Sequence, residues 1–181
     1  MKEIIFVTGG CRSGKSRFAL DYANKHFKSK IFLATAPALD DEMKKRIKAH
    51  QEARGPEWAA IEEQTEIAKA VASVKTGYEV ILLDCMTLWL SNLVMAGEQE
   101  RQIFSRTEAF IETIQKIPQS VIIVSNEVGY GIVAVNDIAR QFRDIMGTVN
   151  QRLAACADVV VWTVVGVPQV IKGQIKRGTS A

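Results

Sequence analysis

Residues 4–16 read Ile4-Ile5-Phe6-Val7-Thr8-Gly9-Gly10-Cys11-Arg12-Ser13-Gly14-Lys15-Ser16. The stretch begins with four apolar side chains, which favour a buried β-strand. It ends with the spacing Gly-x-x-x-x-Gly-Lys-Ser, which is typical of a phosphate-binding loop between a strand and a helix. A chance glycine-rich turn rarely combines every fixed position with the correct flanks. We therefore expect this stretch to bind the phosphates of a nucleoside triphosphate.

The chemistry of such a loop assigns a role to each of its parts. Glycines let the backbone curl so that its N–H groups point at the phosphates, and the start of the following helix adds its positive dipole end. Lys15 is expected to act catalytically at the β- and γ-phosphates, and the Ser16 hydroxyl to ligate Mg²⁺. The candidate nucleotide-binding residues of the loop are Gly9, Gly10, Cys11, Arg12, Ser13, Gly14, Lys15 and Ser16. The loop alone identifies neither the base nor the acceptor.

Beyond the loop, short apolar runs alternate with longer helical patterns. After the first run at residues 4–7, the others cover residues 30–35, 80–84, 121–125, 159–165 and, more weakly, 169–172. They are continuously apolar, as in strands of a parallel sheet that are buried on both faces. Helices are predicted over residues 14–27, 40–54, 64–75, 99–116 and 136–157. The alternation predicts a single domain over residues 1–181, with an α/β fold and a mostly parallel central sheet flanked by helices.

Asp84 ends the third apolar run. An acidic residue at the carboxyl end of a buried strand binds Mg²⁺ in many proteins that carry this loop. Ligands of open α/β sheets also gather at those strand ends. The alternative is an aspartate that only caps a turn or a helix. We favour the metal role, with Ser16 and Asp84 as the two candidate ligands.

The helix predicted over residues 40–54 carries one of the two histidines of the chain. Arg46, His50 and Arg54 follow one another at intervals of four residues, so they share one stripe of the helix. Two guanidinium groups disfavour the cationic imidazole, which is then neutral with a free nitrogen lone pair. A nucleophilic histidine that attacks phosphorus fits this pattern, with the arginines holding phosphate oxygens. A solvated basic helix face explains the residues equally well.

Other residues are weaker candidates. Asn126 and Glu127 follow the fourth apolar run, where they either bind ligand or order the glycine turn behind them. Glu62 is a candidate acceptor for a ribose or a base. The helix predicted over residues 136–157 carries Arg140, Arg143 and Asp144, which either reach phosphate or pair with one another or with a neighbouring subunit. The three tryptophans are expected in the core or an interface rather than in a base-stacking platform; they are Trp58, Trp89 and Trp162.

Composition narrows the class of protein. The chain has 181 residues, a net charge of +3 and 48% hydrophobic residues, which suits a globular protein and is too weakly basic to indicate a nucleic-acid partner. The apolar run at residues 4–7 is too short for a secretory signal, and no run approaches the roughly 20 residues of a membrane helix. We expect a cytoplasmic protein without membrane insertion. Cys11, Cys85 and Cys156 lack the spacing of a zinc site or a disulfide framework.

Taken together, several ordered motifs resemble one known family nearly from end to end. They are Val7–Ser16, Ala34-Thr35-Ala36, Asp41-Glu42-Met43 with Arg46-Ile47 and His50, Leu83–Leu93, Asn126–Gly129, Ala139–Asp144 and Gly147–Gln151. The chain resembles the bifunctional adenosylcobinamide kinase / adenosylcobinamide-phosphate guanylyltransferase of cobalamin biosynthesis. Members of that family are similar in fold to RecA-like P-loop NTPases and form homotrimers.

The resemblance implies two reactions. Adenosylcobinamide is phosphorylated by GTP or ATP, and adenosylcobinamide phosphate then takes a guanylyl group from a guanylylated histidine. That histidine falls on His50, and further nucleotide contacts fall on Ala34, Thr35, Ala36, Gln51, Glu52, Ala53, Arg54, Glu62 and Asp84. Two rivals stay open: a plain P-loop small-molecule kinase with a structural His50, and a GTP switch. A switch usually carries an Asn-Lys-x-Asp motif, which the sequence lacks.

Overall fold

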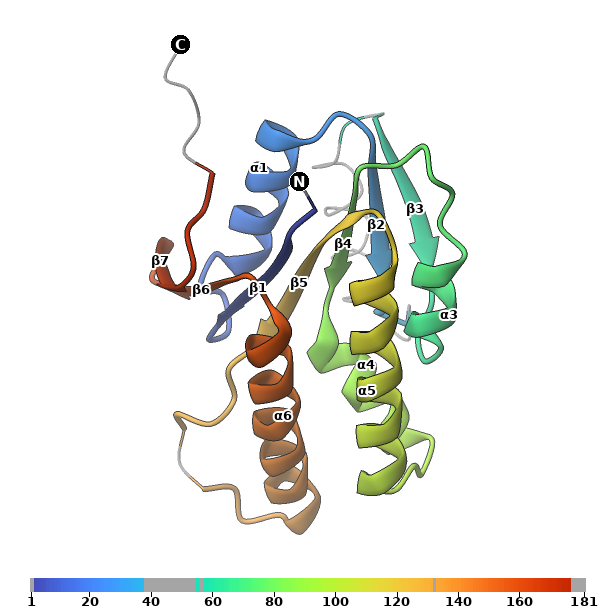
Figure 1. Cartoon of the computed structure of the whole chain (residues 1–181). Helices are drawn as coiled ribbons and strands as arrows, with labels where there is room; N and C mark the ends of the chain where they lie inside the picture. The colour runs from blue at the N-terminus through green and yellow to red at the C-terminus, as the bar shows by residue number, and fades with distance from the viewer. Residues whose placement is uncertain (1, 38–54, 56, 132, 177–181) are drawn as a thin grey trace.

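The computed structural model describes residues 2–37, 55, 57–131 and 133–176 (Figure 1). Seven strands within these residues form one sheet in the order β3-β2-β4-β5-β1-β6-β7. Every neighbouring pair is parallel except β6 and β7, which are antiparallel. The strands are β1 Ile4–Gly9, β2 Lys30–Ala34, β3 Trp58–Glu62, β4 Val80–Asp84, β5 Ser120–Asn126, β6 Val159–Val164 and β7 Val167–Lys172. The mostly parallel sheet predicted from the apolar runs is confirmed.

Helices cover both faces of this sheet. The described helices are α1 Lys15–His26, α3 Ile67–Ala72, α4 Met86–Met95, α5 Glu100–Lys116 and α6 Asp137–Cys156. The helix α1 packs on one face, while the other four pack together on the opposite face, as Figure 1 shows. Among the described helices, none has both the length and the apolar character that crossing a bilayer requires.

The central strands are buried on both faces. Residues 80–83 of β4 and 121–124 of β5 have no measurable exposure. Alternate side chains of each strand enter the two cores, one against α1 and one against the four other helices. Burying a Val, Leu or Ile side chain contributes about 1.5–3 kcal/mol. The apolar runs that predicted these strands therefore also supply much of the stabilisation of the sheet.

Two elements were not predicted from the sequence. The strand β3 is short and rich in alanine, a poor strand former, and it pairs only with β2 among the described strands. The helix α4 is apolar on most sides and begins two residues after β4, so it shows little helical periodicity. The helix predicted at residues 64–75 forms only over Ile67–Ala72. The helix predicted at residues 40–54 lies outside the described residues.

The strand order determines which candidate residues become neighbours. Strand β5 lies between β1 and β4, so the phosphate-binding loop after β1 and Asp84 at the end of β4 are separated by one strand. All parallel strands end at the same edge of the sheet. The loop, Asp84, Ala34 and Glu62 therefore lie along that edge, which is where ligands of open α/β sheets bind.

Candidate nucleotide-binding site

The phosphate-binding loop closes on itself between β1 and α1. Gly14 caps α1 with a positive φ of 93°, a conformation that favours glycine. The Ser13 backbone N–H donates to the Gly10 carbonyl at 3.2 Å. Lys15 is 8% exposed, and its Nζ donates to the same carbonyl at 3.0 Å. The lysine ammonium is therefore held over the loop, where the predicted phosphates would lie.

The hairpin of β6 and β7 supports the loop from the side. The hydroxyls of Ser13 and Thr163 are 2.8 Å apart, and Thr163 also donates to the Thr8 carbonyl at 3.2 Å. In the turn of the hairpin, the Gly166 N–H donates to the Ser13 carbonyl at 2.9 Å. A Cβ on Gly14 would lie 3.2 Å from the Gly166 Cα. Sequence reasoning missed this support because residues 13 and 163 meet only through the pairing of β1 with β6.

We expect Gly9→Ala to damage both folding and triphosphate binding. Its Cβ would lie 2.4 Å from Thr163 Oγ1, 2.5 Å from the Thr163 carbonyl oxygen and 2.6 Å from Ser13 Oγ. Because one of these atoms is backbone, the loop must shift, which lowers the free energy of unfolding by about 1–3 kcal/mol. Thermal unfolding and equilibrium binding of Mg-GTP measure the two effects.

The matched control for this prediction is Gly147→Ala in α6. A Cβ there meets nothing within 4 Å, and a helical Gly→Ala change stabilises by about 1 kcal/mol. The control should raise the melting temperature and leave Mg-GTP binding unchanged. Wild-type stability and affinity in Gly9→Ala would contradict the packing argument.

Asp84 and Cys85 lie where β4 meets α4. Burial, together with the neighbouring Asp84 carboxylate, raises the pKa of the Cys85 thiol to about 11, although Lys15 acts in the opposite direction. Lys15 thus acts electrostatically on a group at the end of β4, although β5 lies between the two strands. The thiol is neutral at pH 7, so it adds no negative charge beside the phosphate loop. Of the two residues, Asp84 is therefore the acidic one at the junction of β4 and α4.

The end of β5 is held by neighbouring side chains. The Asn126 N–H donates to Thr87 Oγ1 at 2.8 Å, and Asn150 Nδ2 donates to the Asn126 carbonyl at 3.1 Å. Ser125 Oγ donates to Asn150 Oδ1 at 2.7 Å. The Glu127 N–H donates to the Gly9 carbonyl at 3.0 Å, so the segment after β5 is tied directly to the loop.

The charged residues beyond β5 mostly order the local backbone. Glu127 Oε1 accepts from the Gly129 N–H at 2.6 Å, which is the turn-ordering alternative considered for this residue. Arg143 Nη2 donates to the Gly129 carbonyl at 2.9 Å. Arg140 donates to the Ala134 carbonyl at 2.9 Å and pairs with Asp137. The arginines thus join the start of α6 to the loop before it.

The remaining described candidates lie farther along the edge. Ala34 ends β2, which is three strand positions from β1, or about 14 Å at the usual spacing. Glu62 ends β3, one position farther, at about 19 Å, and it is exposed. A nucleotide held by its terminal phosphates must therefore extend across the sheet edge for its nucleoside to reach these residues.

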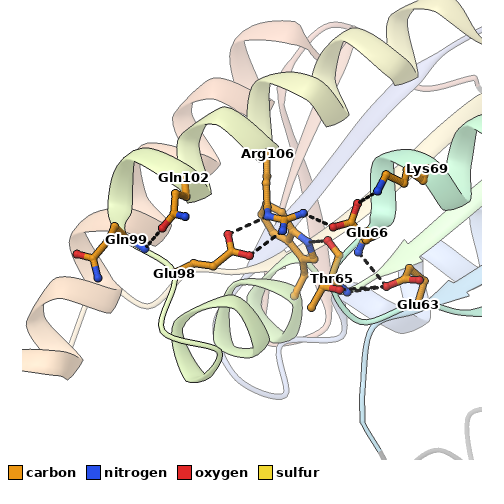
Figure 2. A network of polar contacts seen from close by, with 9 residues as sticks. Glu63, Thr65, Glu66, Lys69, Glu98, Gln99, Gln102 and Arg106 are labelled. Carbon is orange, nitrogen blue, oxygen red and sulfur yellow. Dashed lines mark hydrogen bonds and ion pairs between the residues drawn. The ribbon is translucent and has the colours of Figure 1, made fainter.

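Hydrogen bonds and ion pairs hold the segment that follows Glu62 in place (Figure 2). Glu63 Oε1 accepts from the N–H groups of Thr65 and Glu66, at 2.8 Å each, which lowers the Glu63 pKa against the opposing effect of burial. Arg106 of α5 binds Glu66 at 2.5 Å and Glu98 at 2.8 Å, so it joins the start of α3 to the start of α5. The hydrogen bonds that Glu66 accepts from Lys69 and Arg106 lower the pKa of Glu66. These pairs hold the outer part of the edge in place.

The predicted metal ligands suit Mg²⁺ chemically. Ser16 is the second residue of α1, next to the loop, and Asp84 lies at the end of β4. A hydroxyl and a carboxylate are hard oxygen donors of the kind that Mg²⁺ prefers. The remaining predicted site residues lie outside the described residues; they are His50, Gln51, Glu52, Ala53 and Arg54.

The fold is shared with solved P-loop NTPases. The assembled ATPase EscN of the enteropathogenic Escherichia coli type III secretion system superposes with a TM-score of 0.61 at 9% identity, covering 91% of this chain and 43% of that one. The RadB recombinase superposes with a TM-score of 0.50 at 12% identity, covering 88% and 73%. At such low identity the likeness establishes the fold alone, and it confirms the α/β fold with a mostly parallel sheet that the sequence predicts.

Sequence comparison is more specific. The bifunctional adenosylcobalamin biosynthesis protein CobU of Salmonella typhimurium is 40% identical over 181 residues, covering 93% of this chain and 99% of that protein. The corresponding protein CobP of Pseudomonas aeruginosa is 36% identical over 174 residues, covering 96% and 99%. A family described as cobinamide kinase / cobinamide phosphate guanyltransferase matches residues 5–171. The chain therefore belongs to the cobinamide kinase / cobinamide phosphate guanyltransferase family.

Proposed function

We propose that this chain phosphorylates adenosylcobinamide with GTP or ATP and then converts the product to adenosylcobinamide-GDP through guanylylated His50. The observation that carries the proposal is the family match over residues 5–171, which spans both the phosphate-binding loop and His50. The loop geometry supports it, because the Lys15 ammonium is already gathered over the loop backbone.

In the kinase step, the acceptor hydroxyl oxygen bonds to the γ-phosphorus while the bond from that phosphorus to the β-phosphate oxygen breaks. Nucleoside diphosphate leaves, and the proton of the acceptor hydroxyl passes to solvent. Lys15 and the loop N–H groups stabilise the negative charge that spreads over the transferred group. Bound Mg²⁺, held by Ser16 and Asp84, would neutralise charge on the β- and γ-phosphates.

In the guanylyl step, a ring nitrogen of His50 bonds to the α-phosphorus of GTP and pyrophosphate leaves. A phosphate oxygen of adenosylcobinamide phosphate then attacks the same phosphorus. The P–N bond breaks, a P–O–P bond forms, and His50 is restored. A neutral imidazole is required for the first attack, and Arg46 and Arg54 would favour that state at four-residue spacing.

Label transfer from GTP tests the proposal and both rivals. We expect label from the γ-phosphate to reach the corrinoid, and label from the α-phosphate to reach first the protein and then the corrinoid. A plain kinase would transfer only the γ-label. A GTP switch would release labelled phosphate without adenosylcobinamide and transfer neither label. Either of the last two results would contradict the bifunctional assignment.

We also propose that the chain acts in the cytoplasm as a homotrimer, as the family resemblance implies. Light scattering should then report three times the 20.0 kDa mass of one chain. In the kinase step, the phosphate donor of this proposal is GTP or ATP. Initial rates with each nucleotide measure that preference.

A further inference from the structure

Strand β5 ends between the phosphate-binding loop and Asp84. Asn126, the last residue of β5, is in register with Gly9, the first residue of the loop. On the other side of β5, Asp84 is in register with Val124, two residues before Asn126. At the usual strand spacing and rise, the Asn126 backbone therefore lies about 5 Å from that of Gly9 and about 8 Å from that of Asp84. Asn126 thus lies in the interval that a terminal phosphate occupies when it is held between Lys15 and Asp84.

Strand alternation places the Asn126 side chain on the α1 face of the sheet, because successive side chains of a strand point to opposite faces. Val124 packs in the core that contains α1, whereas Ser125 bonds to α6 on the opposite face. Asn126 comes next and shares the face of Val124. By the same rule, Asp84 follows Leu82 onto the α1 face. The last side chains of β4 and β5 on this face therefore lie under the helix that starts at the phosphate-binding loop and packs over β1, β4 and β5.

The backbone of Asn126 is held by side chains from two helices. Its N–H donates to Thr87 Oγ1 of α4, and its carbonyl accepts from Asn150 Nδ2 of α6. Asn150 is 8% exposed, and its Oδ1 accepts from Ser125 Oγ, so both ends of the Asn150 amide are bonded. A side chain on such a backbone starts from a defined position, which lowers the entropy cost of binding a ligand.

The Asn126 side chain differs from its neighbours in its hydrogen bonding. Within the described part of the chain, no hydrogen bond or ion pair involves its Oδ1 or Nδ2, although the residue is half-buried. The carboxylate of Glu127, by contrast, accepts from the Gly129 N–H. An amide offers two N–H donors to phosphate oxygens and adds no negative charge that would repel them. A neutral donor group with no partner among the described residues therefore lies on a fixed backbone beside the phosphate-binding loop.

We propose that the Asn126 side chain donates to the γ-phosphate of the bound triphosphate, so that the site prefers a triphosphate to a diphosphate. The inference rests on the proposed function, because it takes the loop to hold the phosphates of GTP. The loop N–H groups surround the inner phosphates of a nucleotide, and a diphosphate occupies the same place. Asn126 lies outside the loop, one strand toward Asp84, so it reaches only the phosphate that extends beyond the loop.

The test measures the binding of two nucleotides in the presence of Mg²⁺ by titration calorimetry. They are the α,β-methylene analogues of GTP and GDP, whose α–β bridge is not cleaved, so neither forms an adduct with the protein. We expect Asn126→Ala to weaken binding of the triphosphate analogue by about tenfold or more, as the loss of one hydrogen bond to a charged group does. Binding of the diphosphate analogue should stay within about twofold. Asn126→Asp keeps the shape of the side chain but places a negative charge against the phosphate, so it should weaken the triphosphate analogue at least as much.

Asn24→Ala is the matched control. Asn24 is exposed near the end of α1, where its Oδ1 accepts from Trp58 Nε1 at 2.9 Å. This variant should bind both analogues as the wild-type chain does, and thermal unfolding of every variant reports the folded fraction. Equal losses for the two analogues would show that Asn126 only orders the end of β5, and unchanged triphosphate binding in both Asn126 variants would also overturn the inference. A wild-type chain that binds neither analogue would instead overturn the proposed function on which the inference rests.

Discussion

Lys15→Met is expected to abolish both half-reactions while leaving the fold intact. The change removes the charge that lies over the loop but keeps an apolar stem of similar length. Removing one preorganised charged donor from a transferring phosphoryl group lowers the rate by about a hundredfold to a thousandfold. Because both steps use a triphosphate held by the same loop, γ-label transfer and α-label adduct formation should fall together. Rapid-quench rates at saturating GTP measure the two steps.

A second buried lysine gives the control. Lys30 is 4% exposed and lies at the start of β2, on the opposite edge of the sheet. Its Nζ donates to the Phe27 carbonyl at 3.2 Å and to the Lys28 carbonyl at 3.3 Å. Lys30→Met should lower the free energy of unfolding by about 1–3 kcal/mol, because the buried Phe27 carbonyl and the part-buried Lys28 carbonyl lose their donor, and should leave kcat unchanged. Wild-type rates in Lys15→Met would rule out the assigned role of the loop.

His50→Asn is expected to separate the two activities. Asn cannot form a phosphoramidate, so the α-labelled adduct and guanylyl transfer should fall by a factor on the order of a thousand or more. The kinase step does not need a nucleophile from the protein and should stay within roughly threefold. In the wild-type chain, the adduct should be stable in base and lost in acid, as expected of a P–N bond. Gel autoradiography after acid and base treatment measures this.

His26→Asn controls for the loss of a histidine in general. His26 is the last of the 12 residues of α1, about 16 Å along the helix axis from its start at the loop. Its ring contacts Tyr22 with centroids 4.4 Å apart, and burial lowers its pKa. This variant should retain both activities. An adduct that persists in His50→Asn would place the nucleophile on another residue and leave His50 with a structural role.

The two unpredicted elements show where a pattern in the sequence stops being informative. The strand β3 has the weak strand formers Ala59 and Ala60 at its centre, and its register with β2 is visible only in the folded chain. In α4, Trp89, Leu90 and Leu93 are completely buried, so the helix lacks the polar stripe that periodicity analysis needs. The family resemblance nevertheless includes the motif from Leu83 to Leu93, and polar side chains of this motif bind backbone at the edge of the sheet.

The local chemistry of this protein was determined by the sequence itself. The loop from Gly9 to Ser16, the strand before it and the helix after it follow from steric and hydrogen-bonding rules that act over a few residues. The apolar runs determined a buried parallel sheet, because strands covered on both faces require apolar side chains throughout. These interactions need no information from distant parts of the chain.

Only the tertiary structure decided which of these parts meet. The order β3-β2-β4-β5-β1-β6-β7 places Thr163 against the loop and separates Glu62 from it by about 19 Å. It also brings the Thr35 and Gln64 carbonyls to a single amide of α4. The Ser13 and Thr163 side chains, for example, meet although they lie 150 positions apart in the chain, and such contacts form through strand pairing and shared burial. A pattern along the sequence gives no information about the distance between two residues across the sheet.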